Sequence, residues 1–160
     1  SVWPLLKNLL TGAGQDGMNL QIISAFRSFD TQAILKSSYK ITYGKGTANA
    51  FSADQGYSEH QLGTTIDFTT PKVGLTFTGF EKTKESTWLL DNAYKYGFIL
   101  SYPAQNEFYI YEPWHWRFVG LDLALLLHNN KKNFYDLDQR EINNYLVNIF
   151  SSTLATPTVN

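Results

Sequence analysis

The sequence contains no cysteine, which excludes a disulfide framework and a zinc site built on thiolates. It has no apolar run near the roughly 20 residues that span a bilayer, and no signal peptide is recognisable at its start. Neither charge sign dominates, with 13 Lys and Arg residues against 14 Asp and Glu residues. A broad nucleic-acid surface needs an excess of basic residues. We therefore expect no nucleic-acid partner and no membrane span in this chain.

The residues that are present suit one domain with its own core. The chain has 160 residues and is 43% hydrophobic, which is enough to bury a core without disulfides. Helical and strand patterns occur in clusters rather than in regular alternation, and this predicts an α+β fold with a small antiparallel sheet flanked by helices. We assign residues 1–160 to a single domain, with a helical C-terminal part at 121–150 and a tail at 151–160.

The pattern of apolar residues predicts the individual elements. Helices are expected at 3–10, 83–96 and 121–128, after Asp138 as far as 149, and after a cap at Ser28 or Asp30. β-Branched and aromatic runs predict strands at 20–26, 64–69, 98–102, 108–111 and 114–119. The polar, glycine-rich stretch at 44–56 is predicted to be a loop.

Two of the three histidines lie in short segments that also carry a carboxylate. His60 precedes Asp67 by seven residues, and Gly63 between them favours a loop entering a strand over a helix. Asp67 stands between two hydrophobic residues of that strand, where a carboxylate is costly unless it is paired or binds a cation. Glu112 stands three residues before His115, and Pro113 between them suggests a loop that ends where the strand predicted at 114–119 begins. His115 and Arg117 then share one face of that strand.

These residue types indicate a metal site. Two imidazoles and one carboxylate suffice to hold a catalytic zinc and leave one coordination position open. Glu112 then remains free to act as a base, which is the chemistry of a hydrolase. Structural alternatives stand beside this interpretation, since backbone amides or an arginine can satisfy Asp67 and His115 can be a hydrogen-bonded core residue. The pairing of each histidine with a carboxylate favours the metal.

Arg27 follows the first predicted strand at the start of a helix, which is a suitable place to receive an anionic group. The alternative for Arg27 is a structural ion pair. The aromatic residues, 16% of the chain, are assigned mainly to the core. Trp114 and Trp116 are the exceptions that can line a pocket.

Three segments carry a family resemblance. They read S-A-F-R-S-F-x-x-Q at 24–32, S-x-H-x-x-G-x-x-x-D at 58–67 and E-P-W-H-W-R at 112–117. In this order they resemble the VanY-type D-alanyl-D-alanine carboxypeptidases, which form one superfamily with the lysostaphin and hedgehog zinc domains. The resemblance spans residues 24–120, about three fifths of the chain, and the three motifs together are far more specific than any one of them. Thr65 is a small departure, because many relatives have alanine there.

The resemblance implies one zinc ion per chain, held by His60, Asp67 and His115. It implies Glu112 as the general acid and base, and Arg27 as the group that binds the carbonyl or the terminal carboxylate of the peptide. Residues that would assist in binding the substrate are Gln32, Ser58, Trp114 and Trp116.

The implied substrate is the stem peptide of peptidoglycan or its precursor, cut before a terminal D-alanine with D,D- or L,D-specificity. We expect a monomeric, extracytoplasmic bacterial protein, from which an upstream signal or anchor can have been removed because the chain starts at Ser1. Two alternatives stay open. One is a cell-wall endopeptidase or amidase of the same superfamily, and the other is a non-catalytic, zinc-containing module that binds the wall.

Overall fold

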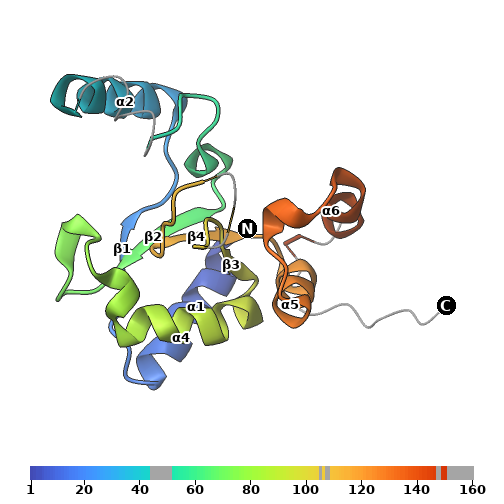
Figure 1. Ribbon diagram of the computed structural model, residues 1–160. Helices are drawn as coiled ribbons and strands as arrows, with labels where there is room; N and C mark the ends of the chain where they lie inside the picture. The colour runs from blue at the N-terminus through green and yellow to red at the C-terminus, as the bar shows by residue number, and fades with distance from the viewer. Residues whose placement is uncertain (44–51, 105, 107–108, 147–148, 151–160) are drawn as a thin grey trace.

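A four-stranded antiparallel sheet forms the centre of the computed structural model, which describes residues 1–43, 52–104, 106, 109–146 and 149–150 (Figure 1). The strands are β1 (Gln21–Ser24), β2 (Thr65–Thr69), β3 (Phe98–Leu100) and β4 (His115–Phe118). They lie in the order β1-β2-β4-β3, with every neighbouring pair antiparallel. Helices surround this sheet, and the predicted α+β class is confirmed.

The helices that start at Phe29 and Lys84 begin where the sequence supplies a capping side chain. Ser28 Oγ accepts a hydrogen bond from the Thr31 amide, and Thr83 Oγ1 accepts one from the Ser86 amide. The α-helices are α1 (Trp3–Gln15), α2 (Phe29–Tyr43), α4 (Lys84–Asn92), α5 (Leu121–Asn130) and α6 (Gln139–Leu146). The 3-10 helices are η1 (Glu59–Leu62), η2 (Gly74–Thr76), η3 (Phe80–Lys82), η4 (Ala93–Tyr96) and η5 (Phe134–Asp136).

The core lies between the sheet and helices α1 and α4, which run beneath it in Figure 1. Alternation along β2 directs Ile66 and Phe68 toward this core, and Asp67 therefore points to the opposite face. Trp116 and Phe118 do the same on β4. Each such side chain contributes about 1.5–3 kcal/mol when fully buried. The apolar face of the sheet thus fixes which residues stand on the other face.

A second cluster of buried residues joins β3 to the C-terminal helices. It is formed by Ile99, Val119, Leu123, Ala124, Leu127, Phe134 and Leu137. Asp138 begins α6 as predicted, because its Oδ1 accepts hydrogen bonds from the amides of Arg140 and Glu141. The C-terminal helices therefore pack against β3 as well as against one another.

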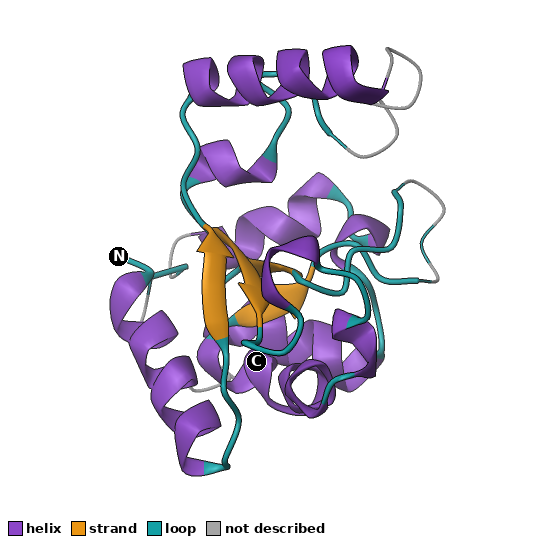
Figure 2. Cartoon of the chain, turned by 90° about the vertical axis from the view of Figure 1, so that its left-hand side faces the viewer, coloured by secondary structure: helices purple, strands orange, loops and turns teal. Residues whose placement is uncertain are grey.

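Helix α2 stands apart from the sheet, as Figures 1 and 2 both show. Two buried side chains hold it to the segment that returns toward η1. Gln32 Nε2 donates to the Ala53 carbonyl at 2.8 Å, and Lys36 Nζ donates to the Ser52 carbonyl and pairs with Asp54 Oδ1 at 3.4 Å. A buried lysine is tolerated here because both its charge and its donors have partners.

Two of the predicted strands differ from the structure. Tyr109, Ile110 and Tyr111 are exposed and form no strand, while Phe108 lies outside the described residues. Asn106 explains the difference, because its side chain bonds the carbonyls of Pro103 and Tyr109 and the Tyr109 amide, which closes a turn. The strand at 20–26 is shorter than predicted and is not buried, since β1 is an edge strand with Ile22 40% exposed.

Two segments predicted from the sequence, the loop and the tail, lie partly or wholly outside the residues that the structure describes. Residues 44–51 of the predicted loop and the tail at 151–160 lie outside the described residues. The assignment of 1–160 to one domain stays a prediction. Among the described helices, none combines the length and the hydrophobicity needed to cross a bilayer.

Candidate metal centre

His60 is held by the loop that connects β1 to α2. It lies in η1, which ends at Gly63 in the left-handed conformation with φ of 70°, a conformation that glycine adopts without strain. The His60 Nδ1–H donates to the Ala25 carbonyl at 2.7 Å, and the Arg27 amide donates to the His60 carbonyl at 3.1 Å. These two bonds fix the imidazole with Nε2 facing the sheet.

Asp67 and His115 meet across two paired strands. They are direct partners in the β2–β4 register, and both are about 95% buried. Asp67 Oδ2 lies 3.1 Å from His60 Nε2, and Asp67 Oδ1 lies 3.1 Å from His115 Nδ1. One ligand atom from each of the three residues lies within 4.8 Å of the others. The structure therefore brings together the three residues predicted to bind the metal.

The hydrogen bonds on the far side of each ring test whether this cluster suits a cation. His60 uses Nδ1–H for Ala25, and His115 Nε2 lies 2.9 Å from Glu59 Oε2, which can only accept. Each neutral ring then turns its unprotonated nitrogen toward Asp67. Two lone pairs and a carboxylate directed at one point are the donor set of a zinc ion, and partners on the outer nitrogens are typical of metal-binding histidines.

Charge in the metal-free cluster is distributed between Asp67 and His115. Burial alone would raise the pKa of Asp67, but its close polar contacts with His115 and His60 lower it from 3.8 to about 2. Burial alone would lower the pKa of His115, but hydrogen bonds to Asp67 and Glu59 raise it from 6.5 to about 9. A proton on His115 thus takes the place of the cation in the metal-free protein.

Glu112 stands beside the cluster and outside it. Its Oε2 lies 3.6 Å from His115 Nδ1, and its amide donates to the Tyr102 carbonyl at 3.1 Å. Burial raises the pKa of Glu112 from 4.5 to about 7, with Asp67 and Glu59 adding repulsion and His115 and Arg27 opposing it. A carboxyl group with a pKa near neutral pH can both take and return a proton.

Arg27 and Gln32 form a connected pair at the same site. Arg27 Nη1 donates to Gln32 Oε1 at 2.7 Å, and Arg27 Nη2 donates to Ser24 Oγ at 3.0 Å. The positive charge of Arg27 lowers the pKa of Glu112, so the guanidinium is near enough to act on that carboxyl group electrostatically. Ser58 is buried directly before η1. The alternative interpretation, an ion pair between Arg27 and an acid, is not found among the described residues, where Nη1 and Nη2 each make one hydrogen bond to a neutral side chain.

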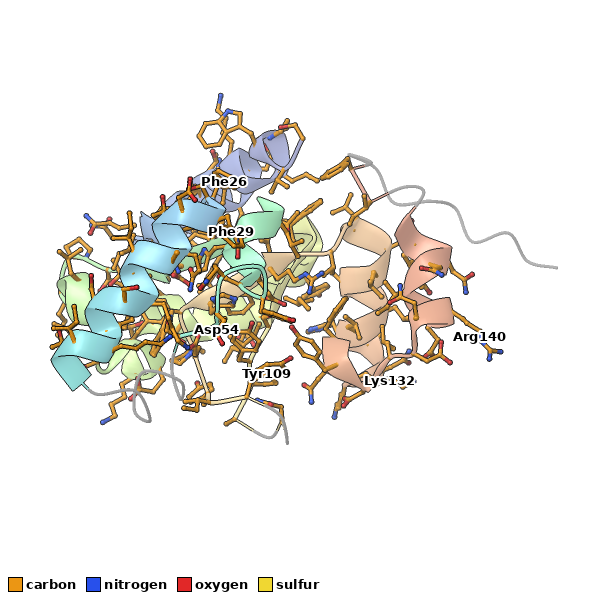
Figure 3. The ribbon with its side chains drawn as sticks, turned by 90° about the horizontal axis from the view of Figure 1, so that it is seen from above. Phe26, Phe29, Asp54, Tyr109, Lys132 and Arg140 are labelled. Atoms are coloured by element: carbon orange, nitrogen blue, oxygen red, sulfur yellow. The ribbon has the colours of Figure 1, made fainter. Side chains whose placement is uncertain are left out.

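Exposed aromatic residues border the Arg27 loop. Phe26 is 67% exposed and Phe29 is 55% exposed, and Figure 3 labels both where the chain enters α2. Phe26 lies over Gly63, since a Cβ added to that glycine would be 3.8 Å from the Phe26 ring. These rings form an apolar rim next to His60.

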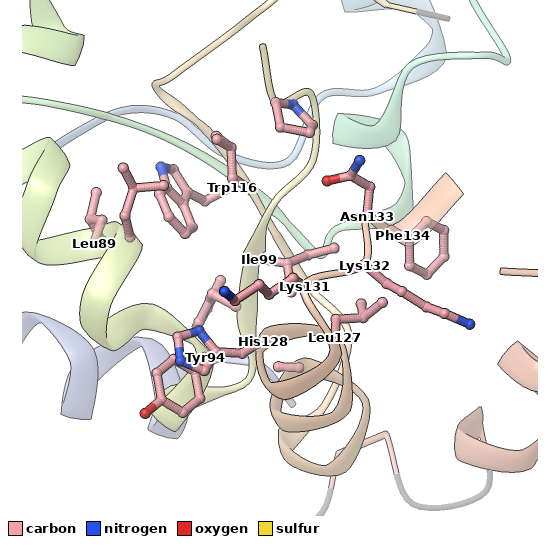
Figure 4. Close-up of a pocket in the computed structure, with 15 residues that line it drawn as sticks. Leu89, Tyr94, Ile99, Trp116, Leu127, His128, Lys131, Lys132, Asn133 and Phe134 are labelled. Carbon is pink, nitrogen blue, oxygen red and sulfur yellow. The ribbon is translucent and has the colours of Figure 1, made fainter. Parts of the chain in front are cut away.

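The two tryptophans occupy different places. Trp114 is half-buried and its ring stacks on Phe77 with centroids 4.8 Å apart. Trp116 is 2% exposed, belongs to the core and lines a cavity of about 290 Å³ at the β3 edge of the sheet, together with Leu89 and Ile99 (Figure 4). Strand alternation separates Trp116 from His115, so Trp116 does not face the cluster. None of the predicted metal ligands lines this cavity.

Glu59 and Tyr135 are site residues that the sequence reasoning missed. Glu59 accepts hydrogen bonds from His115 and from Tyr135, and Tyr102 stacks on the His115 ring with centroids 4.6 Å apart. Glu59 could have been noticed as an acid inside the 58–67 motif. Tyr135 gave no signal, because it is 76 residues away from Glu59 and belongs to no motif.

A buried His-Asp-His cluster on an antiparallel sheet, with a free carboxyl group beside it, defines a candidate mononuclear metal centre of the hydrolase type. A family model described as VanY, D-alanyl-D-alanine carboxypeptidase, matches residues 1–121. The chain therefore belongs to the VanY family of D-alanyl-D-alanine carboxypeptidases.

Individual relatives agree with this family. YodJ of Bacillus subtilis (strain 168) is 36% identical over 129 residues, which are 78% of this chain and 47% of YodJ, so the chain spans about half of that relative's length. The solved structure of the LdcB LD-carboxypeptidase has a TM-score of 0.76 at 32% identity and covers 90% of this chain and 67% of LdcB. A mutant of the D,D-pentapeptidase VanY from a VanB-type resistance cassette, solved in complex with Zn(II), has a TM-score of 0.73 at 29% identity, covering 84% and 80%.

Proposed function

We propose that this chain is the catalytic domain of a zinc carboxypeptidase that removes the C-terminal D-alanine from peptidoglycan stem peptides or their precursors. The observation that carries the proposal is the convergence of His60, Asp67 and His115 within 4.8 Å, with Glu112 next to them. The family match and the Zn(II) complex of the VanY relative support zinc as the ion. Action on the cell wall places the proposed enzyme outside the bacterial cytoplasm.

The residues of the chain divide the work of hydrolysis. A zinc ion held by His60, Asp67 and His115 would supply a Lewis acid that activates water and polarises the scissile carbonyl. Glu112 accepts the proton of the attacking water and passes it to the departing amine. Its raised pKa suits both steps, because the same carboxyl group has to bind and release a proton near neutral pH.

Arg27 supplies recognition of the free C-terminus. A guanidinium presents a planar fork that pairs with a carboxylate through two hydrogen bonds. Gln32 and Ser24 each hold one terminal nitrogen of the guanidinium, and Gln32 is itself anchored to the Ala53 carbonyl. An arginine held in this way discriminates between a free C-terminus and an internal peptide bond, which favours a carboxypeptidase over an endopeptidase.

Defined stem peptides test the proposal directly. The purified chain is incubated with tri-, tetra- and pentapeptide stems, with and without a chelator, and the released alanine is measured by mass spectrometry. Cleavage of the pentapeptide indicates D,D-specificity, and cleavage of the tetrapeptide indicates L,D-specificity, the activity named for LdcB. Release that persists undiminished after complete removal of metal would refute the zinc mechanism, and loss of cross-linked dimers from whole sacculi would favour the endopeptidase.

Replacement of Arg27 tests recognition of the C-terminus. Arg27→Ala should lower kcat/KM for a free-acid stem peptide by about 10²-fold, because a charge-assisted bidentate contact of about 3 kcal/mol is lost. The matched control is Arg140→Ala, since Arg140 is exposed at the far end of the molecule from α2 (Figure 3). A C-terminally amidated peptide should be cut equally slowly by Arg27→Ala and by the wild-type chain. Equal kcat/KM values for Arg27→Ala and Arg140→Ala would contradict this role.

A further inference from the structure

The carboxylate of Glu59 is buried where four donors from three segments of the chain meet. Oε2 accepts from Ser101 Oγ at 2.6 Å and from His115 Nε2 at 2.9 Å. Oε1 accepts from Arg117 Nη1 at 2.8 Å and from the Tyr135 hydroxyl at 2.5 Å. A carboxylate has about four acceptor sites, so all of its capacity is used. Glu59 therefore has no site left for a substrate or for a metal ion.

The bond from Glu59 determines how His115 presents itself. A neutral imidazole carries its proton on one nitrogen, and the partner of that nitrogen selects the tautomer. With Nε2–H directed at Glu59, the lone pair of His115 resides on Nδ1, which faces Asp67. The Tyr102 ring stacked on the imidazole at an interplanar angle of 20° limits rotation out of this plane. Glu59 is thus in the right place to orient His115 toward the metal.

The charge of Glu59 is balanced on its other side. Arg117 is two residues after His115 on β4, so strand alternation places both side chains on the same face. The guanidinium also lies over the Phe134 ring, 4.3 Å from its centroid. Arg117 therefore keeps a negative charge on Glu59 without competing for the oxygen that His115 uses.

Tyr135 connects the C-terminal part of the chain to this network. It lies in η5, beyond residues 1–121 that the family model matches. Asn133 and Asp136 hold η5 with a reciprocal capping box. The Tyr135 ring also contacts Tyr109, with centroids 4.8 Å apart. The capping box of η5 and the contact with Tyr109 thus both hold the Tyr135 hydroxyl in place.

We propose that Glu59 is a positioning residue that holds His115 with Nδ1 directed at the metal, and that Tyr135 from the C-terminal part holds Glu59 in that place. The proposal rests on the metal site of the proposed function, and it assigns to residues 121–146 a part in building that site. Outer-sphere partners of this kind typically change metal affinity 10- to 100-fold when removed.

Metal binding by the full chain tests the proposal without reference to peptidase activity. Glu59→Gln should weaken zinc affinity by about 10- to 100-fold in a competition titration with a chromophoric chelator. Tyr135→Phe removes one hydrogen bond and should weaken it by about 2- to 10-fold. The control is Tyr94→Phe, because Tyr94 stacks on His128 at the cavity beside β3 (Figure 4), and this variant should leave the affinity unchanged. Cobalt substitution adds a spectroscopic reading, and the visible absorption bands should change in Glu59→Gln.

The outcomes separate the two proposals. A folded Glu59→Gln chain whose zinc affinity is within twofold of the wild-type value and whose cobalt spectrum is unchanged overturns the positioning role alone. If Glu59→Gln does not fold, Tyr135→Phe decides, and zinc affinity equal to that of Tyr94→Phe overturns the proposal. A wild-type chain that binds no zinc overturns the proposed function itself.

Discussion

Glu112 and Asp67 are neighbouring buried carboxyl groups whose replacement by amides should change the stability of the metal-free protein in opposite directions. The environment raises the pKa of Glu112 from 4.5 to about 7, so folding opposes its ionisation. The same environment lowers the pKa of Asp67 from 3.8 to about 2, so folding favours its ionisation. The free energy of unfolding depends on pH through these shifts. Raising the pH favours whichever state, folded or unfolded, binds its protons less tightly.

The pKa values give the size of each effect. A pKa change of one corresponds to 1.36 kcal/mol. Ionised Glu112 therefore destabilises the metal-free fold by up to about 3 kcal/mol above pH 7, and this penalty disappears as pH falls below 4.5. Asp67 stabilises it by about 2 kcal/mol above pH 4, and this contribution is lost as pH falls through 2. At pH 8, Glu112→Gln should be more stable than the wild-type chain, and Asp67→Asn should be less stable.

Urea denaturation in the presence of a chelator, followed by circular dichroism at pH 4.5 and pH 8, measures both effects. The gain from Glu112→Gln should be present at pH 8 and small at pH 4.5, while the loss from Asp67→Asn should appear at both. In the zinc-loaded protein Glu112→Gln should keep its metal but lose about 10²- to 10⁴-fold in kcat. A Glu112→Gln chain that is less stable than wild type at pH 8, or equally stabilised at both pH values, would refute this reasoning.

Three further predictions concern the same structure. Zinc binding at pH 7 should release about one proton from His115, because its pKa is about 9 without metal. Calorimetry in two buffers of different ionisation enthalpy would measure this release. A binding enthalpy that is the same in both buffers would contradict it. Gly97→Ala should cost about 2–4 kcal/mol in urea denaturation, because φ is +84° and the new Cβ would meet a Phe118 ring carbon at 2.6 Å. Gly17→Ala, with φ of +75° and nothing within 4 Å, should cost only about 1 kcal/mol, and equal losses would count against the packing argument. Thr65→Val should gain about 1 kcal/mol with unchanged zinc affinity, because the buried Thr65 Oγ1 has no hydrogen-bond partner among the described residues, and a loss of stability would show a hidden partner.

The sequence predicted those parts of the site that strand alternation controls. Asp67 between two hydrophobic residues had to face away from the core, and His115 had to share a face with Arg117. The fold class was also predictable, because the periodicity of apolar residues indicates which face of each helix or strand is buried, and the predicted helices and strands occur in clusters. The Asp138 cap and the end of η4 at Gly97 were also local, and both are present.

Contacts between distant segments were beyond the reach of the sequence. Glu59 looks like any surface glutamate until four donors from distant segments surround it, and Tyr135 carries no pattern that refers to Glu59. The strand predicted at 108–111 failed because the Asn106 side chain bonds the backbone of Pro103 and of Tyr109, and such side-chain bonds override β propensity. Trp116 illustrates a third limit, since residue type alone does not say which face of β4 carries a pocket.

The direct pairing of Asp67 with His115 across β2 and β4 links the geometry of the candidate metal site to the apolar face of the sheet. A shift of either strand by one residue would turn Asp67 toward the helices and bring Ile66 or Phe68 to the polar side. The large rings of Trp116 and Phe118 oppose that shift, because it would remove them from the core that they form with α1 and α4. The apolar side chains on the opposite face of the sheet thus keep the candidate metal ligands in register. Substitutions that enlarge or truncate these side chains should weaken metal binding.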